Sequence, residues 1–417
     1  MGIALLSDLE RKIPQLETAV SIKRVCFYSV STQLGGAEKS LLDLVKSLRR
    51  LEDAKVEGWI LFPKSKGPFV DEVKKEGIPY AVLPMPRFFL KMSRLTPWLS
   101  LLYGILAVPK MVIYLVRWTK LMRRRKVGLI QTNGLKCHLL AALFWPFLRV
   151  PILWHLRDIY SSGGSRILLI ILMRIIPVRM IANSHATARA LDSTGKRITL
   201  VYNGLDPDVW SPQPNAHYRE IFGVSRDVPV IGIVGVLARW KGQLQFLEMA
   251  KKLLSLKVQA RFVIVGEAIY DTAGDSNFKQ ELLKKSQELG LSNLVHFAGF
   301  EKDSVQAINS LDVLVHASVQ PEPFGRVIVE AMACGVPVVA SGAGGVLEYV
   351  EDGKTGRIFP PGDVGAMADA VKELLDSQSI REEIRKNARH LFLTRFTLES
   401  HVKSLLEVYR RVFTTPS

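Results

Sequence analysis

Two glutamates separated by seven residues, Glu322 and Glu330 in EPFGRVIVE, could hold a ligand between them. The apolar run 313–315 ahead of them predicts a buried strand. Pro323 favours extended backbone at Glu322 and Gly325 allows close approach to a ligand, so we expect a helix to begin at about Gly325. Backbone N–H groups at a helix start bind anions. Carboxylates at both ends with amides between them suit a ligand with terminal hydroxyls and central phosphate, which is the layout of a nucleotide sugar.

This stretch resembles the E-x7-E signature of the retaining glycosyltransferases of family 4, which have the GT-B fold. PFG after the first glutamate and AMACGVPVVAS after the second extend the resemblance. In that family the first glutamate, here Glu322, lies beside the donor sugar, and the second, here Glu330, holds the ribose hydroxyls. The resemblance places four more residues at the nucleotide-sugar site: Phe324, Gly325, Arg326 and Val327. The alternative is two solvated glutamates on a loop and a helix surface.

A second glycine-containing loop, Gly35-Gly36, lies between a predicted strand at 24–30 and a helix that we expect to begin at Ala37. Strand, glycine loop and helix in that order begin a doubly wound sheet, whose ligand crevice lies at the carboxyl ends of the strands. A plain tight turn explains the two glycines equally well. GGAE also resembles the family's first-loop motif, which implies that Gly35 and Gly36 approach the donor phosphates.

His155, in PILWHLRD, is predicted to lie at the carboxyl end of another strand of this sheet and to face the same crevice. A histidine at such a place is often structural. The segment resembles the family's P-x-x-x-H pattern, in which the histidine contacts the donor sugar, and this resemblance assigns that role to His155.

A second domain is predicted to open with a buried strand at 230–234, followed by Gly235 and the basic residues Arg239 and Lys241. Cations beyond a strand suit a pyrophosphate, because they offset the charge that grows as the glycosidic bond breaks. The segment resembles the family's G-R-L-x-x-x-K-G, with Lys241 matching its lysine. Val236 occupies the family's arginine position. Either Arg239 reaches the phosphate by another path or this site is weaker than usual.

Further glycines continue the resemblance. Gly299 follows a predicted strand at 294–297 and precedes the loop that in the family packs near the base. Gly344 and Gly345 resemble the family's second glycine loop at the phosphates, and we expect them to open another helix.

The resemblance extends from residue 24 to about 412 and implies an α/β protein of the GT-B class, with two Rossmann-like doubly wound domains facing a central cleft. We expect an acceptor domain at 24–202, basic and facing a membrane, and a nucleotide-sugar-binding domain at 213–395. A helix at 396–417 is expected to cross back to the first domain. Pro207, Pro212 and Pro214 support the boundary between the domains.

Charge is distributed unevenly along the chain. Residues 1–200 hold 32 Lys+Arg and 13 Asp+Glu, a balance of +19, whereas residues 201–417 hold 24 and 26, a balance of −2. Such a field attracts nucleic acid or an anionic membrane face. No basic stripe alternates with stacking aromatics as in nucleic-acid-binding modules, so we expect no nucleic-acid partner.

Residues 87–126 combine an apolar run, interrupted at Pro109-Lys110, with a basic end. A membrane span is disfavoured by its central lysine, and it would put neighbouring strands of one sheet on opposite sides of the membrane. We expect an interfacial segment whose cations lie on anionic lipid at ~1 kcal/mol each. The expected cations are Arg117, Lys120, Arg123, Arg124, Arg125 and Lys126. The alternative is an ordinary helix pair with a solvated basic end.

Other features limit the chemistry. The N-terminal stretch has acids and no long apolar segment, so we expect no secretory signal. Three scattered cysteines, without CxxC spacing, argue against a disulfide framework or zinc site and fit a reducing cytosol. No DxD-like or His/Asp cluster recommends a metal, so we expect no cofactor beyond the nucleotide-sugar co-substrate. No side chain is an obvious nucleophile, and the resemblance implies front-face substitution.

The resemblance implies a retaining hexosyltransferase-type glycosyltransferase (EC 2.4), and with the charge pattern we expect a role in polysaccharide biosynthesis. We expect a cytoplasmic protein, peripherally associated with the inner face of the cytoplasmic membrane, that acts on a lipid-linked or cell-surface glycan. Two alternatives stay open: a soluble transferase with a small-molecule acceptor, and a non-catalytic nucleotide-binding protein whose cleft is degenerate at Val236.

Overall fold

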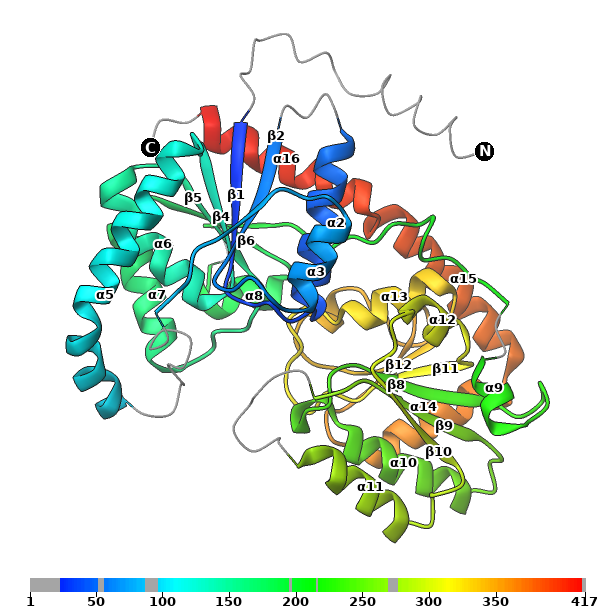
Figure 1. Ribbon diagram of the computed structural model, residues 1–417. Helices are drawn as coiled ribbons and strands as arrows, with labels where there is room; N and C mark the ends of the chain where they lie inside the picture. Colours follow the sequence, from blue (N-terminus) through cyan, green and yellow to red (C-terminus); the bar gives the residue numbers. More distant parts are fainter. Residues whose placement is uncertain are drawn as a thin grey trace.

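The computed structural model describes residues 23–51, 56–86, 97–194, 197–214, 217–268 and 277–414, with backbone alone at 97–107. It contains two parallel β-sheets with helices on both faces of each (Figure 1). The predicted class, two Rossmann-like doubly wound domains, is confirmed. The first part of the basic segment, residues 87–96, lies outside the described residues.

The first sheet has seven parallel strands in the order β3-β2-β1-β4-β5-β6-β7. Its strands are β1 (Lys23–Ser29), β2 (Val56–Phe62), β3 (Tyr80–Val82), β4 (Leu129–Asn133), β5 (Ile152–Leu156), β6 (Val178–Ala182) and β7 (Ile198–Leu200). The connecting helices are α2 (Gly36–Arg50), α3 (Pro68–Lys75), α5 (Pro97–Arg124), α6 (Leu135–Leu148), α7 (Gly163–Ile175) and α8 (His185–Leu191). The central strands are apolar and buried, as expected where helices cover both faces.

The second sheet has six parallel strands in the order β10-β9-β8-β11-β12-β13. Its strands are β8 (Val230–Val234), β9 (Arg261–Val265), β10 (Val295–Gly299), β11 (Val313–His316), β12 (Val338–Ser341) and β13 (Arg357–Phe359). Its helices are α9 (His217–Phe222), η2 (Arg239–Lys241), α10 (Gln243–Ser255), α11 (Phe278–Glu288), α12 (Ser304–Asn309), α13 (Arg326–Cys334), η3 (Gly345–Glu348), α14 (Val364–Asp376) and α15 (Gln378–Arg395). The expected helix at Gly344-Gly345 is wrong in extent, because η3 is a single 3₁₀ turn.

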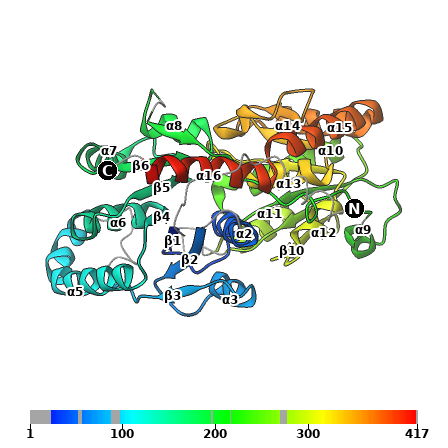
Figure 2. The same cartoon turned by 90° about the horizontal axis from the view of Figure 1, so that it is seen from above.

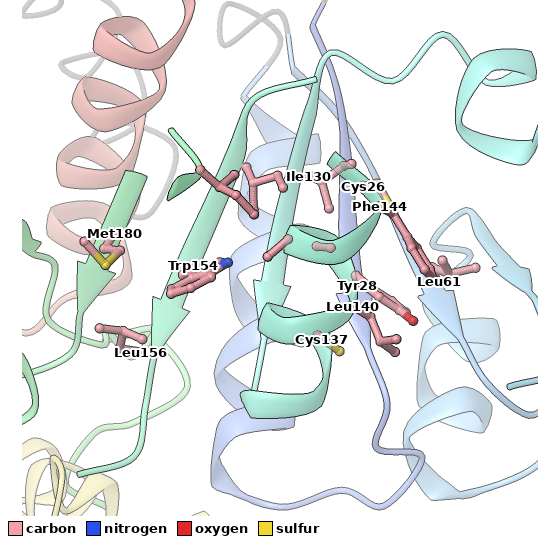
Figure 3. Packing of buried hydrophobic residues seen from close by; sticks show 14 of the residues in the cluster. Cys26, Tyr28, Leu61, Ile130, Cys137, Leu140, Phe144, Trp154, Leu156 and Met180 are labelled. Carbon is pink, nitrogen blue, oxygen red and sulfur yellow. The ribbon is translucent and has the colours of Figure 1, made fainter. Parts of the chain in front are cut away.

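The two faces of the first sheet are covered by different parts of the chain. One face packs against α5, α6 and α7, and Figure 3 shows Tyr28, Phe144 and Trp154 in this layer. The other face packs against α2 and the last helix, α16 (Leu398–Thr414), whose Leu405 and Tyr409 are buried there. Figure 2 shows α16 running along the first sheet after α14 and α15 of the second.

Helix α5 is continuous through Pro109, the proline that interrupts the apolar run in the sequence. It buries Tyr114, Trp118 and Met122, four residues apart, in the layer that it shares with α6. Arg125 just beyond it also turns inward, since its guanidinium lies 4.5 Å from the centre of the Trp59 ring. Within the described part of the chain, none of the helices combines the length and apolarity needed to cross a membrane.

Candidate functional site

Glu322 lies in the loop between β11 and α13 and forms a buried ion pair with Lys241. The lysine Nζ is 2.8 Å from the glutamate Oε2, and the two side chains are 17% and 10% exposed. Lys241 ends the short helix η2, after β8, so two loops at the carboxyl edge of one sheet meet here. The sequence predicted both residues for the site, and the structure brings them together.

Two further side chains donate to or contact the same carboxylate oxygen. Ser318 Oγ lies 3.1 Å from Glu322 Oε2, and His316 Nε2 lies 3.3 Å from it. Burial alone raises the pKa of Glu322, but Lys241 and His316 outweigh that effect and hold it well below its ordinary value. Glu322 is therefore a carboxylate at neutral pH. Sequence reasoning missed His316 and Ser318; the position of His316 at the end of β11 was the available signal.

The start of α13 carries the second glutamate. Gly325 adopts the left-handed conformation (φ 76°) immediately before the helix, which explains glycine at this position. One turn on, Glu330 accepts a hydrogen bond of 2.7 Å from Arg326 Nε. Val327, between them, is half-buried. Phe324 points elsewhere, into an aromatic cluster with Tyr349 (ring centres 5.7 Å apart).

Arg326 also crosses to the first domain. Its Nη1 donates to Ser40 Oγ at 2.9 Å and its Nη2 to Asp43 Oδ2 at 3.0 Å, both on α2. Burial lowers the pKa of Arg326, but the charges of Asp43 and Glu330 overcome this and raise it. One guanidinium therefore joins the predicted ribose-binding glutamate to the helix that follows the first glycine loop.

The glycine loops converge on this region. Gly345 N donates to the Glu322 carbonyl at 2.8 Å, and an added Cβ on Gly344 would lie 2.3 Å from that oxygen. A Cβ on Gly345 would lie 2.9 Å from Ser184 Cβ of the first domain. At the first loop, Gly35 N donates to Glu38 Oε2 at 3.2 Å, and a Cβ on Gly36 would lie 4.0 Å from Arg326 Cδ. The second loop thus packs too tightly for any side chain, whereas the first lies near Arg326 with room for a methyl group at Gly36.

His155 lies near the carboxyl end of β5, as predicted, but its ring is fully buried. It contacts Gln131 and Arg157 on the face of the sheet that α16 covers. Arg157 is itself buried, and burial lowers its pKa to about 10. The sequence did not single out Arg157, although it follows the histidine by two residues.

Arg239 takes a different direction from Lys241. Its guanidinium forms a two-pronged pair with Glu281 of α11 and lies 5.1 Å from the centre of the Phe278 ring. The role predicted for Arg239 at the phosphate stays a prediction.

Two predicted glycines lie at the ends of strands in the same sheet. Gly235 follows β8 with φ 157°, and Gly299 ends β10 with φ 71°. Their predicted roles at the nucleotide sugar stay predictions.

The arrangement can bind an anion next to a hydroxyl-rich group. Lys241, the loop amides and the start of α13 supply positive potential, and Glu322 and Glu330 supply hydrogen-bond acceptors on either side. Over the described ranges, no three His, Cys, Asp or Glu side chains gather as a metal site.

Known families match both halves of the chain. The model described as "Glycosyltransferase Family 4" matches residues 34–209, and the model described as "Glycosyl transferases group 1" matches residues 215–411. Together they cover the second sheet, every strand of the first sheet except β1, and the site residues between them.

Individual curated relatives of the chain are also named as glycosyl-transferring enzymes. The "Alpha-D-kanosaminyltransferase" of Streptomyces kanamyceticus is 33% identical over 47% of this chain and 49% of the relative. The "D-inositol 3-phosphate glycosyltransferase" of Mycolicibacterium smegmatis is 31% identical over 56% of this chain and 52% of the relative. The matched region thus spans about half the length of these curated relatives.

Among solved structures, Anabaena HepE in complex with UDP-glucose is 27% identical, with a TM-score of 0.79 over 93% of this chain and 99% of that one. A Rickettsia africae glycosyltransferase shares the fold at 20% identity, with a TM-score of 0.78 over 95% of this chain and 100% of that one. From the two family models and this fold, the chain belongs to glycosyltransferase family 4 and has the GT-B architecture.

Proposed function

We propose that this protein transfers a hexosyl group from a UDP-sugar to a glycan carried at the cytoplasmic face of a membrane, with retention of anomeric configuration. The observation that carries the proposal is the buried Lys241–Glu322 pair, set 2.8 Å apart beside the start of α13. UDP is the nucleotide of choice because the HepE structures hold UDP and UDP-glucose.

Each charged side chain has a task in this reaction. Lys241 stabilises the negative charge that develops on the departing diphosphate. Glu322 accepts hydrogen bonds from hydroxyls of the transferred sugar, and Glu330 accepts those of the ribose. The acceptor attacks from the face that the diphosphate leaves, and the leaving oxygen takes its proton. No metal or other cofactor has a part in this scheme.

The proposed membrane contact is the outer surface of the helix layer formed by α5, α6 and α7, which we call the apolar face. Its exposed apolar side chains are Val108, Val112, Ile113, Val116, Leu143, Phe147, Ile167, Leu168, Ile171 and Ile175. Cations on α5 border them, including Arg117, Lys120 and Arg124, and Asp158 is the one acid in residues 77–191 of the sequence. Apolar side chains bordered by cations suit an anionic bilayer surface.

A small-molecule acceptor is the second candidate. The names of two relatives that are 31% to 33% identical, a kanosaminyltransferase and an inositol 3-phosphate glycosyltransferase, favour it. This candidate predicts transfer in the absence of membrane lipid.

The test is nucleotide release by the purified full chain with UDP-, GDP- and ADP-hexoses, each with and without a membrane lipid extract. We expect release of UDP, stimulated by the extract. Release that depends on a soluble polyol or amino sugar instead would establish the second candidate. Saturable UDP binding without release under any condition would overturn the transferase proposal.

A further inference from the structure

The buried ring of His155 is held by two hydrogen-bond donors on one nitrogen. Gln131 Nε2 lies 3.2 Å from His155 Nδ1, and Arg157 Nη2 lies 3.3 Å from the same atom. A guanidinium can donate hydrogen bonds but cannot accept them. Nδ1 therefore acts as the acceptor and carries no hydrogen.

The Gln131 amide is held on its other side by α16. The Tyr409 hydroxyl of α16 donates to Gln131 Oε1 at 2.5 Å, in a buried position. A tyrosine hydroxyl can donate or accept, so Tyr409 holds the amide in place, and Arg157, which identifies Nδ1 as an acceptor, decides that the NH₂ group of the amide faces His155. The chain of hydrogen bonds thus runs from α16 through β4 to β5.

The other ring nitrogen has no partner in the described structure. His155 Nε2 is buried and unpaired, and so is Arg157 Nε. Arg157 Nη1 is bound to Asn203 Oδ1 at 2.9 Å, in the segment that leads to the second domain. Since buried donors are nearly always satisfied in proteins, the open Nε2–H of His155 has the capacity to donate a hydrogen bond to a ligand oxygen.

We propose that Gln131, Tyr409 and Arg157 are positioning residues that fix His155 as the neutral Nε2–H tautomer, so that it can only donate a hydrogen bond to the sugar. This rests on the proposed function for the identity of the ligand, but not for the tautomer. Tyr409 and Asn203 belong to the two connections between the domains, so movement of either connection changes the orientation of His155.

The first test reads the tautomer directly, in the ligand-free protein, from ¹⁵N and ¹³C NMR of labelled histidine. The His155 signals are assigned by their loss in His155→Gln. We expect Nδ1 to show the shift of an unprotonated nitrogen and Nε2 that of an N–H. The reverse pattern would overturn the proposal, whether or not the protein proves to be a transferase.

The second test changes the donor into an acceptor with Gln131→Glu. The carboxylate cannot donate to Nδ1, so the hydrogen moves to Nδ1, and Arg157 bonds to the new carboxylate. We expect kcat for UDP-hexose to fall about 10²-fold, as for a small misplacement of a group that contacts the substrate, with KM little changed. An unchanged tautomer together with an unchanged kcat would contradict the assignment.

A third test uses a smaller change, in case Gln131→Glu does not fold. Tyr409→Phe removes a single hydroxyl and leaves the ring in the core, so Gln131 loses its orientation while the chain keeps its packing. The matched control is Tyr218→Phe in the second domain, since Tyr218 is equally buried and its hydroxyl has no partner within the described residues. We expect lower kcat for Tyr409→Phe only. Equal kcat values for the two variants would show that Tyr409 does not position His155.

Discussion

The guanidinium of Arg326 lies 3.0 Å from the carboxylate of Asp43, although 283 residues separate the two in sequence. Arg326 begins α13 of the second domain, and Asp43 lies on α2 of the first. The same arginine holds Glu330, so the proposed ribose site and the contact between the domains share one side chain. If Glu330 binds the ribose as proposed, donor binding and the contact between the domains are coupled through Arg326.

Asp43→Asn tests this coupling. Removing the charge weakens a partly buried ion pair, and because Asp43 is 31% exposed we expect a loss of about 1 kcal/mol in the free energy of unfolding. The control is Asp71→Asn, whose partner Lys74 lies 3.5 Å away on the surface. Chemical denaturation compares the two. Equal stability of both variants would show that the contact between the domains contributes nothing.

Gly345→Ala tests how closely the second glycine loop approaches its neighbours. The new methyl group would lie 2.3 Å from the Pro323 carbonyl and 2.9 Å from Ser184 Cβ of the other domain. We expect turnover to fall more than tenfold, because the loop must move away from the donor site. Gly164→Ala is the matched control, since a Cβ there meets nothing within 4 Å. Full turnover by Gly345→Ala would show that a shift of this loop does not affect the donor site.

Strands and helix starts were predictable because their signals are local. The buried runs predicted at 24–30 and 230–234 became β1 and β8, and the glycine before α13 marks its start as expected. Both parallel sheets require strands that are apolar on two faces, and such strands can be recognised from sequence without tertiary information.

Long-range contacts were not predictable in the same way. Nothing near Arg239 in the sequence indicates Glu281, which lies 42 residues away and pairs with it, and nothing near His155 indicates Tyr409. Helix α5 continues through Pro109 against the local preference of proline, and the burial of Tyr114 and Trp118 one turn and more beyond it, in the layer with α6, is a tertiary contact that the local sequence does not indicate.

The stability of the protein in acid depends on Glu322. Its pKa in the folded state lies well below 4.5, so its contribution is complete above pH 4.5 and declines as the pH falls towards the folded-state value. Glu322→Gln cannot titrate. We expect the difference in unfolding free energy between wild type and variant to be largest at pH 7 and to shrink between pH 4.5 and 3. A difference that grows on acidification would contradict the sign of the shift.

The apolar face predicts binding to anionic vesicles. Phe147→Ser combined with Ile171→Ser removes two exposed apolar side chains, one from α6 and one from α7. We expect about 30-fold weaker co-sedimentation with phosphatidylglycerol vesicles, because partial burial contributes about 1 kcal/mol for each of the two side chains.

The control for this measurement is the double variant Leu283→Ser and Leu393→Ser, two exposed leucines of the second domain. It is expected to bind as the wild type does. Unaltered binding by the variant of the apolar face would reject that surface as the contact, and preference for DNA over vesicles in low salt would replace the membrane with nucleic acid as partner.

The most direct test of the account is the turnover of Lys241→Met with a saturating UDP-hexose and its acceptor. The methionine keeps the length of the side chain but removes the charge that lies 2.8 Å from Glu322 and faces the departing diphosphate in the proposed reaction. We predict a kcat about 10²- to 10³-fold below that of the wild type, as for loss of one preorganised electrostatic contact. Turnover equal to that of the wild type would contradict the assignment of the site.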